Sequence, residues 1–191
     1  MRKVVKEQEL TSTQLFTLSY QTCQWWNAIF IQAKRFLEVW KDHTGGDPWE
    51  HGEKGSLFVA DRMFLIVAIH HAIENLEKLD IELQRQNDTT LHSVIKAIES
   101  VAPLQDIKNL RDMNTHSLDY LAEKGFMQDQ FRSTIKKGDI RIMTTASWTI
   151  VHGDAKLFLL GNVPIDKLLQ VMKEQLPFVR AKTEEVFYKS I

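Results

Sequence analysis

The sequence predicts a mainly α-helical protein: an up-and-down four-helix bundle with a small antiparallel β-ribbon and a C-terminal helix. Apolar residues recur at three- and four-residue intervals over most of the chain, which is typical of amphipathic helices. The links between these segments are short, which favours antiparallel neighbours. Only the stretch after Gly125 contains short β-prone runs separated by turn residues, so the β-structure is predicted to be small.

The composition indicates one folded domain. The chain has 191 residues, of which 43% are hydrophobic and 26% charged, and these proportions are ordinary for a globular protein. We assign the whole chain, 1–191, to a single domain, with the bundle core at 10–125, the ribbon at 126–162 and the last helix at 163–191. The net charge of −1 gives no global attraction to nucleic acid, so a nucleic-acid site would have to be local.

The sequence is that expected of a cytoplasmic protein. The single cysteine, Cys23, excludes an intrachain disulfide framework and fits a reducing compartment. The first seven residues carry positive charge but no apolar stretch follows, so they do not resemble a secretory signal. The longest apolar run, 63–69, is far shorter than the roughly 20 residues that a membrane helix needs. We expect no association with a membrane.

Two long helices are predicted first. The helix over 11–41 begins at three hydroxyl residues that can cap it, and a glycine-rich loop is expected over 43–56. The second long helix is expected over about 57–85. The apolar stripe of the first helix is Leu15, Leu18, Trp25, Ile29, Phe36 and Trp40, and that of the second is Phe58, Leu65, Ile69, Ala72, Leu76 and Leu79.

Shorter elements follow. Asn87 and Asp88 are predicted to turn the chain into a helix over 91–101, and Pro103 opens a fourth helix that stops at Gly125. The runs at 140–143, 148–151 and 157–160 are β-prone, and the residues 152–154 separate the last two as a hairpin turn would. Pro164 leads the final helix, 165–188.

The fourth predicted helix contains the best candidates for chemistry. At about 100° per residue, Ile107, Leu110 and Asn114 share one face, which we predict to be the core face. Asp112 and His116 lie four residues apart and point away from that face. A carboxylate at this spacing can hydrogen-bond the imidazole, fix its tautomer and favour its protonated form.

The outer side of this helix has a mixed character. Asn109, Met113 and Tyr120 are expected to share it with His116. A surface that combines a methionine and a tyrosine with polar groups favours contact with another molecule, and a second protomer is the simplest choice.

The segment Arg111-Asp112-x-x-x-His116, late in a predicted four-helix bundle, resembles the signature of the HEPN superfamily. That signature is an arginine, a polar residue, three to five others and a histidine. The resemblance covers roughly residues 10–125, and it implies a homodimer in which the arginine and histidine of both protomers meet in a cleft. Many members are RNases, often toxins of toxin–antitoxin or phage-defence systems, so the resemblance implies RNA as a substrate and an antitoxin protein as a partner.

The residues are also suited to this chemistry on their own terms. Metal-independent RNA cleavage needs a group that transfers protons near the 2′-hydroxyl or the leaving oxygen, and a cation near the charged phosphate. His116 fits the first role and Arg111 the second, with Asp112 positioning His116. Neither a cofactor nor a metal is expected. Side chains expected to line the cleft are Asn114, Tyr120, Glu74, Lys136 and Lys137.

Two alternatives to a ribonuclease stay open. In the first, the chain is a catalytically silent HEPN-fold interaction or regulatory module, with Arg111 paired to a neighbouring acid and His116 solvated. In the second, the chain is a metal-binding helical bundle that uses His70, His71 and Glu74, with His92 or His116 as a further ligand. Against the metal site, His70 and His71 face directions about 100° apart on a helix.

Overall fold

The predicted mainly α fold is confirmed. The computed structural model describes residues 9–42, 52–115, 133–137, 140–144, 149–151, 157–160 and 163–190, and the side chains of 9–38, 60–112 and 163–190. The helices of these ranges are α1 (Ser12–Asp42), α2 (Gly52–Arg85), α3 (Thr90–Glu99), α4 (Leu104–Thr115) and α7 (Ile165–Lys189).

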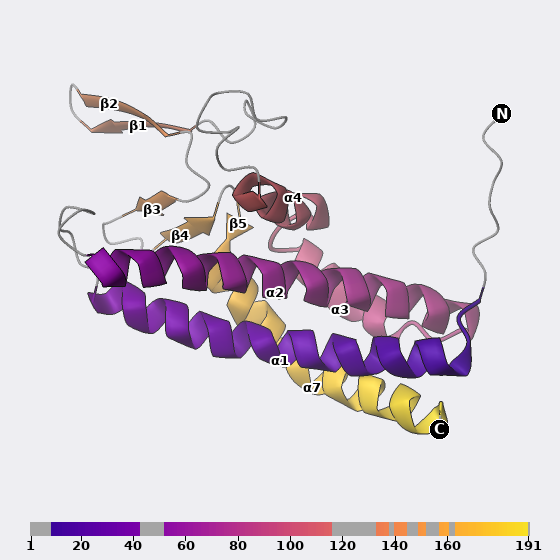
Figure 1. Cartoon of the computed structure of the whole chain (residues 1–191). Helices are drawn as coiled ribbons and strands as arrows, with labels where there is room; N and C mark the ends of the chain where they lie inside the picture. The colour runs from indigo at the N-terminus through magenta and orange to yellow at the C-terminus, as the bar shows by residue number, and fades with distance from the viewer. Residues whose placement is uncertain are drawn as a thin grey trace, which may run out of the picture.

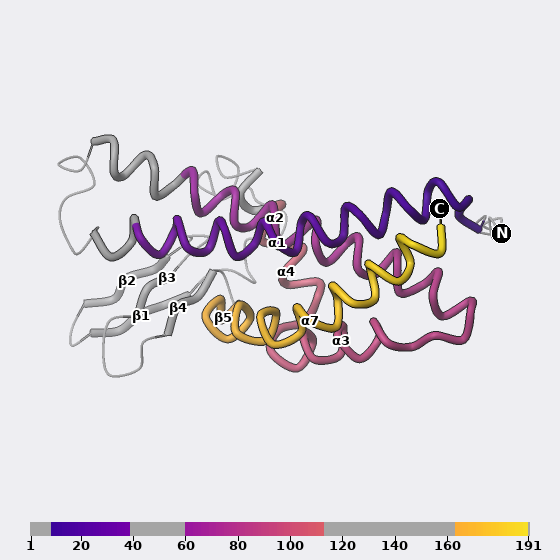
Figure 2. Tube along the Cα trace, turned by 90° about the horizontal axis from the view of Figure 1, so that it is seen from below, coloured from indigo at the N-terminus to yellow at the C-terminus, as the bar shows by residue number. Residues whose placement is uncertain are grey.

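Four of the helices form a closed ring of contacts. The long helices α1 and α2 pack side by side, α2 contacts α3, α3 contacts α7, and α7 returns to α1 (Figures 1 and 2). The helix α4 packs mainly on α2, from outside this ring. The C-terminal helix therefore completes the bundle, and α4, which carries the predicted chemistry, lies on its surface.

The buried core draws on every described helix. Trp26 and Phe36 of α1 and Leu91 of α3 are fully buried, and the predicted α2 stripe is buried from Leu65 to Leu79. The core is not confined to the predicted range 10–125, because α7 contributes Leu168, Met172, Val179 and Val186. Burial of such side chains is the main stabilising contribution to a domain of this kind.

The first helix begins with a reciprocal cap. The backbone N–H of Thr11 donates to Gln14 Oε1 over 2.9 Å, and the N–H of Gln14 donates to Thr11 Oγ1 over 3.3 Å. This is the capping-box arrangement, in which two backbone donors at the helix start are satisfied by side chains. The predicted hydroxyl cap is therefore confirmed at Thr11.

Two details of the long helices differ from the prediction. The helix α2 begins at Gly52, inside the stretch predicted as a loop, because extending a long packed helix past a glycine costs only about 1 kcal/mol. In α1, Trp26 is fully buried, whereas Trp25, which the stripe contained, is only partly covered. The Trp26 indole N–H donates to the carbonyl of Met172, 3.1 Å away on α7, and this tertiary contact draws Trp26 inward.

The described strands form two small antiparallel sheets. The strands β1 (Ser133–Lys137) and β2 (Ile140–Thr144) pair with each other, and β3 (Thr149–Val151), β4 (Leu157–Leu160) and β5 (Val163–Pro164) form the second sheet. The predicted hairpin is confirmed by the pairing of β3 with β4. Strand β1 was not predicted, because its sequence of serine, threonine and lysines around one isoleucine lacks a β-prone apolar run. Among the described residues, no helix is long and apolar enough to cross a membrane.

Candidate functional site

The helix α4 is fixed by two buried side chains. Ile107 and Leu110 are each 1% exposed, and α4 packs on α2. Pro103 precedes the helix and its carbonyl accepts the N–H of Asp106 over 3.0 Å. Both predicted core positions that the structure describes are thus confirmed, and they set the direction in which the next residues point.

Arg111 and Asp112 follow Leu110 at the surface. Their side chains are 48% and 57% exposed, and Arg111 Nη1 lies 3.3 Å from Asp112 Oδ1. An ion pair at this exposure contributes little to stability, because water screens it and two side chains lose freedom to form it. The pair therefore presents a cation and a carboxylate at the surface of α4 at little energetic cost.

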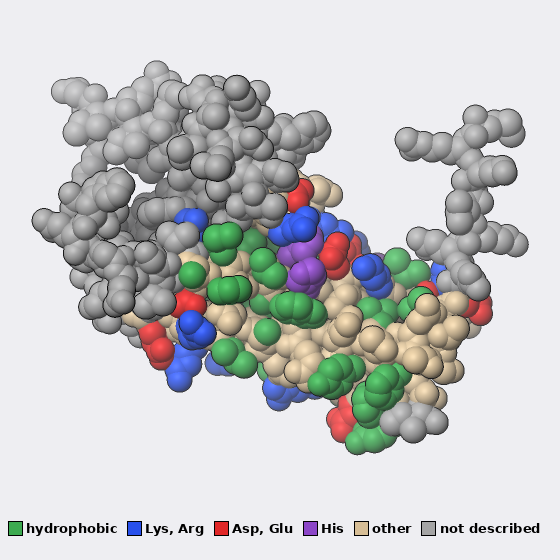
Figure 3. All heavy atoms as spheres, viewed as in Figure 1, with side chains coloured by type: hydrophobic (Ala, Val, Ile, Leu, Met, Phe, Trp, Pro, Cys, Tyr) green, Lys and Arg blue, Asp and Glu red, His purple; other side chains and the backbone are tan. Residues whose placement is uncertain are grey.

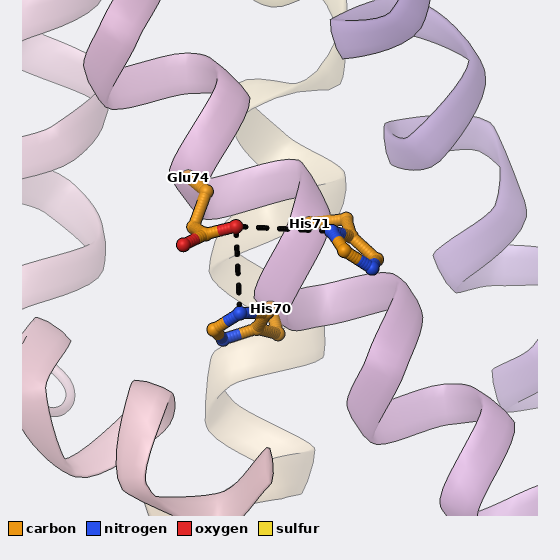
Figure 4. Close-up of side chains that lie close together, drawn as sticks. All are labelled: His70, His71 and Glu74. Carbon is orange, nitrogen blue, oxygen red and sulfur yellow. Dashed lines mark ion pairs between the residues drawn. The ribbon is translucent and has the colours of Figure 1, made fainter. Parts of the chain in front are cut away.

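Three potential metal-ligand side chains converge on the neighbouring face of α2. Glu74 Oε2 lies 3.4 Å from His70 Nε2 and 3.8 Å from His71 Nδ1 (Figure 4). Glu74 is four residues after His70 and three after His71, so it reaches both imidazoles from one turn further along the helix. The His71 ring also lies against Trp25, with ring centroids 4.7 Å apart.

The two groups of residues are electrostatically connected. Burial lowers the pKa of His70 below its ordinary value, and the nearby Glu74 carboxylate partly offsets this shift. His71 and Arg111 lower the pKa of His70 further, and Asp112 raises it. The charges of α4 therefore act on a histidine of α2, and the five residues form one candidate site at the α2–α4 contact.

The site opens to solvent. The side chains of His71 and Glu74 are 40% and 37% exposed, whereas that of His70 is 10% exposed. On the face shown in Figure 3, histidine side chains lie at the surface between basic and acidic ones and next to apolar ones. The His71 imidazole and the Glu74 carboxylate are therefore both accessible to a ligand from solution.

One expectation about α4 is wrong. Asn109, expected on the outer side with His116, is only 5% exposed. Its Oδ1 accepts a hydrogen bond from Gln105 Nε2 over 2.8 Å, and its Nδ2 is buried without a partner among the described residues. The reason is that α4 is buried on more than one side. A helical-wheel projection that assumes one packed face therefore underestimates the burial of Asn109.

The structure tests only some of the other predicted site residues. Glu74, expected to line the cleft, lies on α2 beside His70 and His71, and its place in a cleft stays a prediction. His116 and Tyr120 lie outside the described residues. Asn114 belongs to α4, and Lys136 and Lys137 belong to β1, but their side chains also lie outside the described part. The contact of Asp112 with His116 therefore stays a prediction.

The cluster on α2 could be found in the sequence from the spacing of Glu74, which follows His71 by three residues and His70 by four. Judged by the angle between them, His70 and His71 should diverge, yet their ligand atoms and that of Glu74 all lie within 4.8 Å of one another. His92, considered as a further ligand, instead pairs with Asp80 at 3.3 Å. Glu74 is four residues after His70 and three after His71, and both spacings bring side chains together on a helix. Two adjacent histidines can therefore contact the same carboxylate.

Comparison with known proteins adds no relative: no family model, no curated protein and no solved structure matches this chain.

Proposed function

We propose that this protein is a HEPN-like, metal-independent endoribonuclease that acts as a homodimer, with Arg111, Asp112 and His116 as its catalytic segment. The observation that carries the proposal is the placement of Arg111. It follows the buried Leu110 on a helix anchored to the bundle, and it projects with Asp112 at the surface. An exposed arginine on this helix supports the proposal, because a cleft between two protomers needs its cation at the surface.

The chemistry assigns one role to each residue. The 2′-oxygen of the RNA attacks the adjacent phosphorus while the P–O5′ bond breaks, which leaves a 2′,3′-cyclic phosphate and a 5′-hydroxyl. One proton leaves the 2′-hydroxyl and another is delivered to the departing 5′-oxygen, and His116 transfers a proton in this exchange. Arg111 stabilises the negative charge that develops on the phosphate oxygens, and Asp112 orients His116.

The electrostatics of α2 support this site. Burial lowers the pKa of His70 most, and His71 and Arg111 lower it further, while Glu74 and Asp112 raise it. The Arg111 guanidinium is thus close enough to α2 to act on its charged groups. A toxin or phage-defence role, with an antitoxin protein as partner, belongs to the same proposal and comes from the HEPN resemblance alone.

The proposal is tested by cleavage of a mixed RNA pool in the presence of EDTA. We expect the wild type to cut RNA, Arg111→Ala to lose about 10²–10³-fold in rate, and His116→Ala about 10²–10⁴-fold. Arg180→Ala is the matched control, because Arg180 is an exposed arginine that donates to Asn27 Oδ1 over 2.6 Å on another part of the surface.

Mixing the two inactive variants tests the shared cleft. If the arginine and histidine of one site come from different protomers, a heterodimer of Arg111→Ala and His116→Ala has one intact site, and about a quarter of the activity returns. Inert, folded and dimeric wild-type protein would instead favour the alternative, an interaction or regulatory module without catalysis. A protein that is monomeric at micromolar concentration would contradict the shared cleft.

A further inference from the structure

A compact set of ligand atoms lies on α2, beside the segment proposed to cut RNA. His70 Nε2 and His71 Nδ1 lie 3.4 Å and 3.8 Å from the same oxygen of Glu74, and the three ligand atoms lie within 4.8 Å of one another. Tetrahedral zinc with nitrogen and oxygen ligands at about 2.0–2.2 Å separates its ligand atoms by about 3.3–3.6 Å. Small side-chain rotations would bring all three to one ion.

The geometry points to a site for one divalent transition-metal ion, of the zinc type, held by His70, His71 and Glu74. Figure 4 shows both imidazole rings and the carboxylate on the same stretch of α2, with dashed lines joining one Glu74 oxygen to each ring. This inference does not depend on the proposed ribonuclease, which uses no metal. It assigns a second ligand to the same surface.

The surroundings hold the ligands in place. His70 is 8% exposed, and the neighbouring Ile69 and Ile73 are buried, so this part of α2 is fixed by the core. His71 is held by its contact with the Trp25 ring. A ligand set on a rigid helix loses little conformational freedom when the ion binds, which favours binding.

The donor set selects the kind of ion. Two imidazoles and one carboxylate suit zinc and the neighbouring transition metals, whereas calcium and magnesium prefer all-oxygen sites. Three protein ligands leave one tetrahedral position for water, and the exposure of His71 and Glu74 lets solvent reach it. A structural zinc site has four protein ligands. A site with three protein ligands and a free position is instead typical of a metal that exchanges or carries a reactive water.

The local charges act in both directions. Arg111 lies close enough to influence His70 and opposes the approach of a cation, while Asp112 and Glu74 favour it. A bound ion would add positive charge next to Arg111, where an anionic ligand such as a phosphate would meet both.

Direct metal binding tests the site without RNA. Protein prepared without an affinity tag and freed of metal is titrated with ZnCl₂ in competition with a chromophoric chelator, and with CoCl₂ followed by its visible absorption. We expect one ion per chain and a tetrahedral cobalt band, and we expect His71→Ala and Glu74→Gln each to weaken zinc binding at least tenfold. Both side chains are partly exposed, so the variants should fold, which circular dichroism checks.

The matched control is His92→Ala. His92 is also a partly exposed histidine beside a carboxylate, Asp80, but it lacks a third ligand within reach among the described residues. Zinc affinity should stay unchanged in this variant. Equal zinc binding by the wild type and by His71→Ala and Glu74→Gln, or no binding by the wild type, would overturn the inference. Either result leaves the cleavage experiment untouched, because that experiment is done in EDTA.

Discussion

Two charged clusters in this protein have opposite characters. At the turn between α2 and α3, Lys182 of α7 is bonded to Asp88 and to Glu185, 2.6 Å away, and its side chain is 10% exposed. At the α2–α4 contact, His71 and Glu74 are more than one third exposed, and Nδ1 of the buried His70 has no hydrogen-bond partner among the described residues. In the first cluster, called the closed cluster, the buried cation is paired with two carboxylates. In the second, called the open cluster, two of the three side chains are accessible to solvent.

The shifts in pKa express the same difference. Burial lowers the pKa of Lys182, but its hydrogen bonds to Asp88 and Glu185 outweigh this effect and raise the pKa overall. The Lys182 hydrogen bond, followed by bonds from Thr90, lowers the pKa of Asp88 to about 2. In that cluster both charged forms are favoured, whereas at the α2–α4 contact burial disfavours the charged form of His70.

Asp88 also organises the turn itself. Its Oδ1 accepts the backbone N–H of Thr90 over 2.9 Å, so it caps the start of α3 in place of Thr89, which makes no side-chain cap bond. Asn87 before it has φ of 61°, a left-handed conformation that asparagine tolerates better than most residues. One carboxylate thus joins the turn, the start of α3 and the terminal helix, and the comparison indicates that this cluster stabilises the fold while the open one is available for a ligand.

The largest effect on stability is expected for Lys182→Ala. Removing the cation leaves Asp88 without its main partner, and a broken buried pair costs about 3–5 kcal/mol. Because the Asp88 side chain is 25% exposed, we expect a smaller loss of about 2 kcal/mol in the free energy of unfolding, measured by urea denaturation. Lys189→Ala is the control: Lys189 also pairs with Glu185, but it is 73% exposed, so the change should stay within about 0.5 kcal/mol. Equal effects of the two substitutions would contradict the distinction between the clusters.

Acid should weaken the closed cluster next. The pKa of Asp88 is about 2 in the folded protein and 3.8 in its ordinary state, so its contribution is fully present above pH 3.8 and is lost as the pH falls toward 2. The full shift corresponds to about 2.4 kcal/mol, and partial exposure reduces this to about 1–2 kcal/mol.

Chemical denaturation between pH 5 and pH 2 measures this loss. Asp88→Asn should be less stable at pH 5 and should show a smaller drop in stability over the same interval. An unchanged acid dependence in this variant would mean that other carboxyl groups account for the loss. The raised pKa of Lys182 acts at the other extreme, because its contribution is present below pH 10.5 and disappears as the pH rises through its folded value.

The smallest effects are expected at the open cluster. His71→Ala and Glu74→Gln should each change the free energy of unfolding by no more than about 0.5 kcal/mol, because partly exposed side chains outside the core rarely contribute more. Thermal and urea unfolding in the absence of metal measure this directly. A loss as large as that of Lys182→Ala would show that the open cluster is structural after all, and would remove the contrast.

The sequence predicted the features that depend on local patterns. The α2 stripe from Leu65 to Leu79 is buried as predicted because it follows the helical period, and Thr11 caps α1 because a hydroxyl preceded the apolar repeat. The start of α4 after Pro103 and the pairing of β3 with β4 have equally local causes.

The features that the sequence could not predict depend on contacts between distant segments. Lys182 looks like a surface lysine, and only the approach of α7 to the α2–α3 turn explains its burial. Asn109 is covered on a flank that a single-stripe model of α4 leaves exposed. The site lies between these two cases. The spacing of Glu74 from His70 and His71 was visible in the sequence, but the influence of Arg111 on His70 depends on the packing of α4 on α2.

The hydrogen bond from Trp26 to the carbonyl of Met172 joins residues 146 positions apart. During synthesis α1 is made long before α7, so Trp26 cannot reach its final partner until Met172 has left the ribosome. Until then the face of α1 that packs on α7 has no permanent cover. This part of the core therefore closes only after α1, α2 and α3 have all been synthesised.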